Sequence, residues 1–156
     1  MTNYLISICV SVHREKPEFL VRCFDSIKNQ TYRNYELIIV CDDVRDNKLL
    51  EIVNSMDGAK VYKHDHSGVA YSRNVFLKNC SGDICTYLDS DNYWDKYYLE
   101  VVNKVFNLPK VSNCYMALKK IHSGEILFKK FDYGELVKDN YIDMNVYAHS
   151  RKLYEE

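Results

Sequence analysis

The chain has 156 residues, of which 47% are hydrophobic and 28% are charged, and its formal net charge at pH 7 is −1. This size and composition are typical of one globular domain, and the near-zero charge gives no basis for nucleic-acid or membrane-surface binding. No apolar run approaches the roughly 20 residues that span a bilayer, and the N-terminal MTNYLISICVSVHRE lacks the features of a signal peptide, so we predict no transmembrane segment and a cytoplasmic location.

Strands and helices alternate over residues 1–106. Their predicted order is strand 4–12, helix 17–30, strand 35–41, helix 46–56, strand 60–64, helix 67–79, strand 83–89 and helix 94–106. The first, second and fourth strands are almost continuously apolar, as expected for strands that are covered on both faces. Pro17 stands where a first helical turn tolerates proline, and Ser67 is a predicted N-cap. This alternation predicts an α/β fold with a doubly wound, mainly parallel sheet flanked by helices.

The sequence after residue 106 has a different pattern. Residues 113–132 are typical of a β-hairpin that turns at Ser123-Gly124, residues 141–149 of a further strand, and residues 150–156 of the start of a helix. The composition does not shift and no linker or repeat is visible. We therefore predict a single domain over residues 1–156.

The six cysteines lie mostly inside apolar runs, and no C-x-x-C occurs. Disulfide frameworks and thiolate metal sites usually show characteristic spacings, which this sequence lacks. The pattern predicts buried, reduced thiols, in agreement with a cytoplasmic location.

Polar and acidic residues follow three of the predicted parallel strands. The first strand ends in Ser11-Val12-His13-Arg14, the second in Asp42-Asp43 and the fourth in Asp89-Ser90-Asp91. Ligands of open parallel sheets bind at the carboxyl ends of the strands, so we expect these residues to line one cleft. Turns favour aspartate on their own account, and this simpler explanation accounts for any one of these acids taken alone.

Four acids in one cleft repel one another, and each close pair costs about 4 kcal/mol at 4 Å and an effective dielectric constant near 20. A bound cation would offset this repulsion, and carboxylate oxygens favour the hard ions Mg²⁺ and Mn²⁺. Asp89 and Asp91 stand two apart in an extended segment and so point the same way. They are the candidate metal ligands.

The order of these segments resembles the nucleotide-binding half of the family 2 glycosyltransferases, which have the GT-A fold. The segments SIKNQTYRNYELIIVCDD, GVAYSRN and GDICTYLDSDN carry the resemblance, which extends over about the first 105 residues. The resemblance implies a UDP-, GDP- or dTDP-sugar donor and a divalent metal, Mn²⁺ or Mg²⁺. It also implies glycosyl transfer, usually with inversion, to an acceptor such as a glycan or a lipid-linked sugar.

The resemblance also implies roles for particular residues. Ser11 and His13 match the positions that contact and stack on the nucleobase, and Asp43 matches the acid that hydrogen-bonds the base. Val12 and Asp42 complete the set on this side of the predicted site. The family usually reads Pro-Thr-Tyr-Asn at 11–14 and Gly-Ser at 44–45, where this chain has Ser-Val-His-Arg and Val-Arg. These departures leave the base and the sugar open.

The other side of the predicted site concerns the ribose and the metal. Arg73 matches the arginine that faces the nucleotide, Asp89 the acid near the ribose, and Asp91 the metal ligand of the D-x-D motif. Ser90 lies between the two acids, with its backbone close to the donor. The resemblance therefore implies that residues 1–106 form the nucleotide-sugar-binding half of the domain.

The family's general base follows the stretch that NYIDMNVYAHSRKLYEE resembles, and the chain stops before that motif. Asp132, Asp139 and Asp143 are nearby acids, but none stands in the matching position, so the general base is unknown. Residues 107–156 would then form an incomplete acceptor-side half. Two functions stay open: a metal-dependent glycosyltransferase, and a nucleotide-sugar-binding module without transfer activity. A sugar nucleotidyltransferase would need a glycine-rich loop that SVHREKPE does not contain.

Two further groups have more than one interpretation. His64-Asp65-His66 lacks a third ligand at suitable spacing, so a solvated loop is a better interpretation than a zinc site. Trp94 with Tyr93, Tyr97 and Tyr98 could stack on a sugar, although helix packing explains Tyr97 and Tyr98 equally well.

Overall fold

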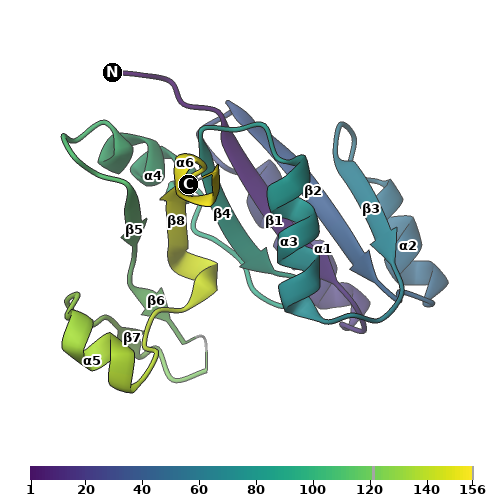
Figure 1. Cartoon of the computed structure of the whole chain (residues 1–156). Helices are drawn as coiled ribbons and strands as arrows, with labels where there is room; N and C mark the ends of the chain where they lie inside the picture. Colours follow the sequence, from purple (N-terminus) through teal and green to yellow (C-terminus); the bar gives the residue numbers. More distant parts are fainter. Residues whose placement is uncertain (121, 156) are drawn as a thin grey trace.

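The computed structural model describes residues 1–120 and 122–155, and a six-stranded sheet lies at its centre (Figure 1). Its strands are β1 (Ile6–Val12), β2 (Tyr35–Asp42), β3 (Lys60–His64), β4 (Ile84–Asp89), β5 (Asn113–Tyr115) and β8 (Tyr147–Ser150). They are arranged in the order β3-β2-β1-β4-β8-β5. Strands β1 to β4 pair in parallel, and β8 is antiparallel to both β4 and β5. The predicted doubly wound, mainly parallel sheet is confirmed.

Helices cover both faces of the sheet. Those that follow β1 to β4 are α1 (Pro17–Lys28), α2 (Asn47–Asn54), α3 (Val69–Asn79) and α4 (Tyr98–Phe106). Residues of α1, α2 and α4 form one core cluster with the sheet, and Phe76 of α3 packs in a second cluster with Cys9 and Tyr87. Figure 1 shows α3 on the near face and α1 and α2 on the far face. Burial on both faces explains why β1, β2 and β4 are almost continuously apolar.

Helix α3 begins later than predicted. Its N-cap is Gly68 and not Ser67, and Gly68 has a φ of +82°, which favours glycine. The backbone N–H groups of Ser67 and Gly68 both donate to the carboxylate of Asp42, at 2.9 Å each. The loop before α3 is therefore held by the end of β2, which the local sequence does not reveal.

The C-terminal third differs from the prediction in three respects. Strand β5 pairs with β8 in the main sheet, so the hairpin is limited to β6 (Leu118–Lys119) and β7 (Ile126–Leu127). The Ser123-Gly124 turn is present, and the Gly124 N–H donates to the carbonyl of Lys120 at 2.9 Å; residue 121 lies outside the described residues.

The predicted strand 141–149 is the second difference, because only its end, in β8, is a strand. The Asp143 side chain accepts from the Asn145 N–H and so starts a short 3₁₀ helix, η1 (Met144–Val146). The third difference is α5 (Tyr133–Lys138), a helix that was not predicted. Helix α6 (Lys152–Glu155) agrees with the predicted helix start.

All six cysteines are free, and all but Cys114 are buried, as predicted. Among the described residues no helix has both the length and the apolar character needed to cross a bilayer. The segment before β1 is tied to α4, because the Tyr4 N–H donates to Asn103 Oδ1 at 3.2 Å.

Candidate functional site

A cavity of about 430 Å³ lies where β1, β2 and β4 end and α3 begins. Eight of the nine predicted site residues line it: Ser11, Val12, His13, Asp42, Arg73, Asp89, Ser90 and Asp91. Five further residues complete the lining: Glu15, His66, Gly68, Val69 and Ser72. We call this cavity the strand-end cleft. The parallel strands thus bring together residues that are up to 80 positions apart in the chain.

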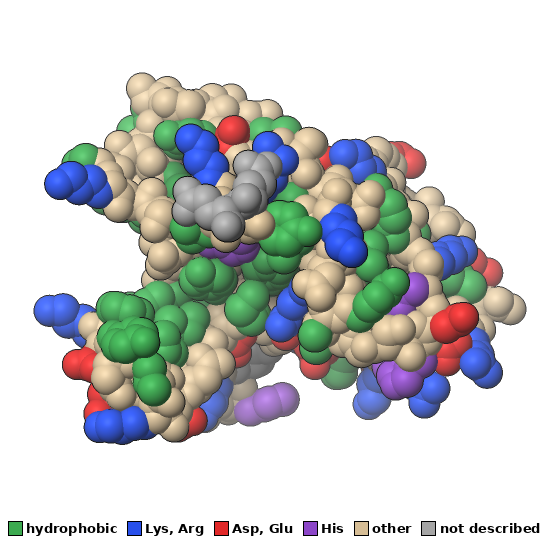
Figure 2. Space-filling model, viewed as in Figure 1, with side chains coloured by type: hydrophobic (Ala, Val, Ile, Leu, Met, Phe, Trp, Pro, Cys, Tyr) green, Lys and Arg blue, Asp and Glu red, His purple; other side chains and the backbone are tan. Residues whose placement is uncertain are grey.

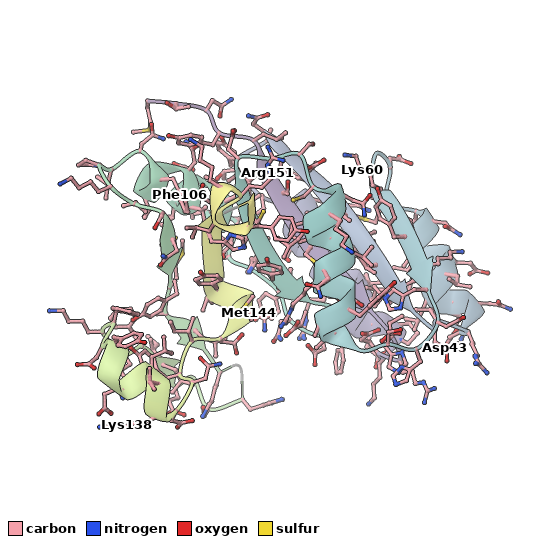
Figure 3. The ribbon with its side chains drawn as sticks, in the orientation of Figure 1. Asp43, Lys60, Phe106, Lys138, Met144 and Arg151 are labelled. Atoms are coloured by element: carbon pink, nitrogen blue, oxygen red, sulfur yellow. The ribbon has the colours of Figure 1, made fainter. Side chains whose placement is uncertain are left out.

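Asp43 is the predicted site residue that does not line the strand-end cleft. Its backbone has a φ of +51°, and its carboxylate lies 2.8 Å from Arg45 Nε and 3.8 Å from a terminal nitrogen of Arg14. The hydrogen bond from Arg45 lowers the pKa of Asp43. Figure 3 shows Asp43 at the cleft end of β2, far from Lys60 at the other end of the sheet. Its carboxylate is therefore already paired with two arginines.

Asp42 is buried and supports the loop before α3. Burial raises the pKa of its carboxyl, but the N–H groups of Ser67 and Gly68 and the nearby His64 and His66 outweigh that effect, so the pKa is lowered. Asp42 therefore stays ionised at a lower pH than an ordinary aspartate does. Its role in holding the cleft wall is visible in the structure, whereas any contact with a ligand remains a prediction.

Asp89 is held from two sides. Asn145 accepts from the Asp89 N–H at 2.6 Å and donates to Asp89 Oδ2 at 2.9 Å. Arg73 approaches Asp89 Oδ1 at 3.3 Å, and its guanidinium lies 5.8 Å from the centre of the Tyr87 ring. Both carboxylate oxygens of Asp89 therefore have a partner, and the side chain has little freedom to turn.

Asn145 is buried and is itself fixed by its surroundings. Its backbone N–H and its Nδ2 both donate to Asp143 Oδ1, at 2.8 Å each. Its backbone carbonyl accepts from Trp94 Nε1 at 2.6 Å. A chain of hydrogen bonds thus runs from Trp94, in the loop before α4, through Asn145 of η1 to Asp89 at the end of β4.

Of the four aromatic residues that follow the D-x-D motif, two are buried and two are exposed. Trp94 and Tyr98 are buried and stack with ring centres 4.2 Å apart, so they pack in the core and do not form a sugar-stacking wall. Tyr93 and Tyr97 are half exposed. The Arg22 guanidinium lies 4.7 Å from the centre of the Tyr93 ring and donates to the Asp91 carbonyl at 2.9 Å.

Glu15 connects two edges of the strand-end cleft. Its carboxylate accepts from the His13 N–H at 3.0 Å and from the Ser90 hydroxyl. The loop after β1 is therefore tied to the turn after β4. Glu15 also adds a negative charge to a cleft that already contains Asp42, Asp89 and Asp91.

Asp91 is the acid that best fits a divalent metal. Its side chain is exposed, and within the described residues its carboxylate accepts one hydrogen bond, from Asn92 Nδ2 at 3.1 Å. Mg²⁺ and Mn²⁺ prefer such hard oxygens and are commonly held by one or two carboxylates together with substrate phosphates. Asp89, the other predicted ligand, is already paired with the Arg73 guanidinium at 3.3 Å, and that positive charge opposes a cation there, so Asp91 is the better of the two.

A second, larger cavity of about 700 Å³ lies between the sheet and the segment formed by β6, β7 and α5. Ten of its fifteen lining residues are apolar or aromatic, among them Tyr115, Met116, Ile126, Phe128 and Tyr141, and the other five are polar or charged. Arg73 and Asp89 line both cavities, so the two are neighbours. Figure 2 shows the hollow between this segment and the main body, with hydrophobic side chains along it. We call this cavity the hairpin groove.

Two of the three acids considered near the C-terminus cap short helices. Asp132 caps α5 by accepting from the Glu135 N–H at 3.0 Å, and Asp143 caps η1. Asp139 is exposed at the end of α5. Of the three, Asp143 lines the hairpin groove. None is therefore identified as a general base.

Five lining residues were not predicted as site residues, among them Glu15 and His66. Asn145, which lies behind Asp89 and does not line the cleft, was not predicted either. Glu15 lies two residues after His13, so its acceptance of the His13 N–H is a local contact. For Asn145 the Asp143-x-Asn145 spacing is a turn-forming signal. Their contacts with Ser90 and Asp89 are long-range, and sequence patterns carry no trace of those.

The sequence model described as glycosyl transferase family 2 matches residues 7–144. Two curated relatives are the UDP-Glc:alpha-D-GlcNAc-diphosphoundecaprenol beta-1,3-glucosyltransferases WfgD and WfaP of Escherichia coli. WfgD is 29% identical over 146 residues, which are 89% of this chain and 57% of that protein. WfaP is 33% identical over 144 residues, which are 86% of this chain and 56% of that protein. The chain thus spans little more than half the length of these relatives.

Solved structures share the fold at low identity. TarS 1-349 of S. aureus in complex with UDP-GlcNAc has a TM-score of 0.79 and 16% identity, and the match covers 96% of this chain and 46% of that one. The mannosyltransferase PcManGT from Pyrobaculum calidifontis, in complex with GDP-Man and Mn²⁺, has a TM-score of 0.71 and 16% identity, covering 97% and 46%.

Proposed function

The chain belongs to glycosyltransferase family 2, and on that premise we propose that its strand-end cleft binds a nucleotide-diphospho-sugar from which a glycosyl group is transferred to an acceptor. One observation carries the proposal: eight residues that the family resemblance assigns to the donor line a single cavity. That cavity lies at the carboxyl ends of parallel strands, where open α/β sheets bind their ligands.

Within this proposal each edge of the strand-end cleft has a task. Ser11 and His13 contact the nucleobase, and Asp89 accepts hydrogen bonds from the ribose. Arg73 lies 3.3 Å from Asp89 and places a positive charge beside the diphosphate. Residues 1–106 form the donor-binding half.

Asn145 acts as a positioning residue in this scheme, because it contacts Asp89 and reaches the donor only through it. By holding the carboxylate and the backbone of Asp89 together, it keeps the acid in one rotamer before the donor arrives. A preorganised acceptor of this kind avoids the entropic cost of ordering a free side chain on binding.

Asp91 would hold the divalent metal, Mn²⁺ or Mg²⁺. When bound, such an ion neutralises the diphosphate and so makes the nucleotide a better leaving group. The exposed Asp91 carboxylate supplies a hard oxygen on the cleft side, and Glu15, Asp42 and Asp89 add to the negative field that attracts a cation.

The hairpin groove is the proposed acceptor site. It adjoins the strand-end cleft through Arg73 and Asp89, and its apolar, aromatic lining suits the hydrophobic faces of a sugar or of a lipid-linked acceptor. WfgD and WfaP are named for diphosphoundecaprenol-linked acceptors, which supports the same class here. The location we propose is cytoplasmic, supported by the free cysteines.

A second function stays open, because the candidate acids near the hairpin groove have structural tasks. Asp132 and Asp143 cap short helices, and neither stands at the position that matches the family's general base. If residues 1–156 contain no general base, they bind the donor without transferring its sugar. An assay of donor hydrolysis and transfer by this chain separates the two functions.

Calorimetry with UDP, GDP and dTDP, each with and without Mn²⁺, tests the donor site directly. We expect one of the three nucleotides to bind, and to bind more tightly with the metal. Asp91→Asn should remove the metal-dependent part, whereas the control Asp57→Asn, an exposed acid after α2, should not. Equal affinities for the parent and Asp91→Asn in Mn²⁺ would contradict the metal assignment. Failure of all three nucleotides to bind would contradict the donor site.

A further inference from the structure

Two histidines and an aspartate from three separate segments meet in the strand-end cleft. His13 follows β1, Asp42 ends β2, and His66 lies in the loop between β3 and α3. Ligand atoms of the three side chains all lie within 4.8 Å of one another. We propose that this cluster, which we call the His₂Asp cluster, binds one transition-metal ion of the Zn²⁺ class, separate from the Mn²⁺ or Mg²⁺ at Asp91.

The orientation of His13 suits a metal ligand. Its Nδ1 is hydrogen-bonded to the backbone carbonyl of Asp42, and a carbonyl can only accept, so Nδ1 carries the hydrogen. In this tautomer the lone pair that can bind a metal is on Nε2. Metal-binding histidines commonly donate their other ring N–H to a carbonyl or carboxylate, which fixes the ring in this way.

Asp42 supplies a carboxylate that is already in place. It is 4% exposed, and the N–H groups of Ser67 and Gly68 orient its two oxygens. Each oxygen accepts one of these N–H groups and keeps a further lone pair. The dry, oriented carboxylate thus needs little rearrangement to coordinate a cation.

His66 is placed to complete the set. Its Nδ1 lies 3.6 Å from Asp42 Oδ2, and its ring stacks on that of His13 with centres 4.9 Å apart. A distance of 3.6 Å is too long for a hydrogen bond, but it is close to the separation of about 3.4 Å between two ligands of a tetrahedral ion with bonds near 2.05 Å. The nitrogen lone pairs lie in the ring planes, so the His66 ring has to turn out of this stack to share an ion with His13, and its exposure of 64% leaves room for that turn.

His64 also approaches Asp42, at 3.4 Å, but it is not part of the cluster. Its Nδ1 contacts the Asp65 carbonyl at 2.7 Å, and its Nε2 contacts the Ser72 hydroxyl at 3.0 Å. Both ring nitrogens are therefore in use. The local His64-Asp65-His66 sequence gave no third ligand, whereas the fold brings His13 and Asp42 to His66.

The ligand types select the kind of ion. Two imidazoles and one carboxylate suit Zn²⁺ and Co²⁺, whereas Mg²⁺ and Mn²⁺ favour oxygen ligands such as Asp91. Three protein ligands leave at least one coordination position open, and all three line the strand-end cleft. A bound ion would also tie β1, β2 and the loop before α3 together, so it would stabilise the folded chain.

Titration of the metal-free, nucleotide-free chain with Co²⁺, followed by visible absorption, tests the site. We expect a single Co²⁺ with the absorption of nitrogen and oxygen ligands, without the charge-transfer band that a cysteine thiolate produces. Zn²⁺ should displace it and should raise the melting temperature. His66→Gln and His13→Gln should each weaken Co²⁺ binding roughly tenfold or more, as expected for loss of a metal-ligand contact.

Two control variants separate this site from others. His122→Gln changes an exposed histidine on the β6–β7 connection, and Asp91→Asn changes the proposed Mn²⁺ ligand; neither should alter Co²⁺ binding. Absence of Co²⁺ binding, a thiolate band, or unchanged affinity in both His66→Gln and His13→Gln would each overturn the proposal. Because no nucleotide is present, these outcomes are independent of whether the donor site is correctly assigned.

Discussion

The side-chain amide of Asn145 forms two hydrogen bonds with Asp89: it accepts from the Asp89 backbone N–H at 2.6 Å and donates to the Asp89 carboxylate at 2.9 Å. The two residues are 56 positions apart, and their contact joins η1 to the end of β4. Asp89 lines both the strand-end cleft and the hairpin groove. One buried amide therefore sets the position of an acid that two cavities share.

Asn145→Ala should weaken nucleotide binding and lower stability. The variant leaves the Asp89 N–H without its partner and frees the carboxylate to turn, at a cost of about 1–3 kcal/mol in the free energy of unfolding. Titration calorimetry well below the melting temperature of the variant measures the nucleotide affinity of the folded chain. If Asn145 only stabilised the fold, that affinity would be unchanged. Asn74→Ala, an exposed position on α3, is the matched control and should bind nucleotide normally.

Arg73→Met should reduce the affinity for the nucleoside diphosphate that the chain binds. The guanidinium is the cation that lines the strand-end cleft beside Asp89, and its loss leaves the acids of the cleft facing the diphosphate. We expect an affinity loss of roughly tenfold, which corresponds to about 1.4 kcal/mol. Lys78→Met removes an exposed charge from the last turn of α3 and should have little effect. Equal losses in the two variants would indicate a general charge effect.

The stability of the chain should fall in acid partly through Glu36. Burial raises the pKa of this carboxyl, but hydrogen bonds from Lys60, Ser7 and Ser81 outweigh that effect and lower the pKa to about 2. The unfolded chain therefore takes up the proton first. The stabilisation is complete above the usual value of 4.5 and is lost as the pH falls toward 2.

Glu36→Gln tests this expectation by urea denaturation. At pH 7 the variant should be less stable by about 1–3 kcal/mol, and the difference should shrink as the pH falls below the unfolded pKa. Glu51→Gln, an exposed change on α2, should show no such difference. If the difference in free energy of unfolding between Glu36→Gln and the parent stays constant down to pH 3, the lowered pKa of Glu36 is contradicted.

Gly82→Ala should destabilise the start of β4. A Cβ at this position would lie 2.5 Å from Ser7 Oγ and 2.7 Å from the Leu5 carbonyl, and the second contact is with backbone that cannot turn away. We expect a loss of about 1–3 kcal/mol by thermal or urea unfolding. Gly134→Ala in α5 meets one side-chain oxygen, the capping Asp132 Oδ1, at 3.3 Å and no backbone atom, so its loss should be much smaller. Similar losses in both variants would argue against the steric explanation.

The parallel half of the fold was predictable because each strand carries its own signal. Strands β1, β2 and β4 are buried on both faces, so their apolar runs are visible in the sequence without knowledge of their neighbours. Parallel pairing then places their carboxyl ends together, which is why seven of the nine predicted site residues line one cavity; Arg73 joins them from α3.

The C-terminal third was less predictable because its strands are short. Strand β5 has three residues and β8 has four, and their pairing with each other depends on contacts across more than thirty positions. Local preference favoured a long hairpin, but the antiparallel edge of the main sheet offered β5 a better partner. The Asp143 cap likewise ended the predicted strand early.

By itself the sequence determined the parallel sheet, the acids at its strand ends and the family, because apolar runs and local motifs are properties of neighbouring residues. Tertiary structure decided the rest. It paired Asp43 with Arg14 and Arg45, set Asn145 behind Asp89, and joined His66 to His13 and Asp42. Each of these contacts links separate segments or depends on the exact direction of a side chain, and such geometry arises only when the sheet and its loops pack together.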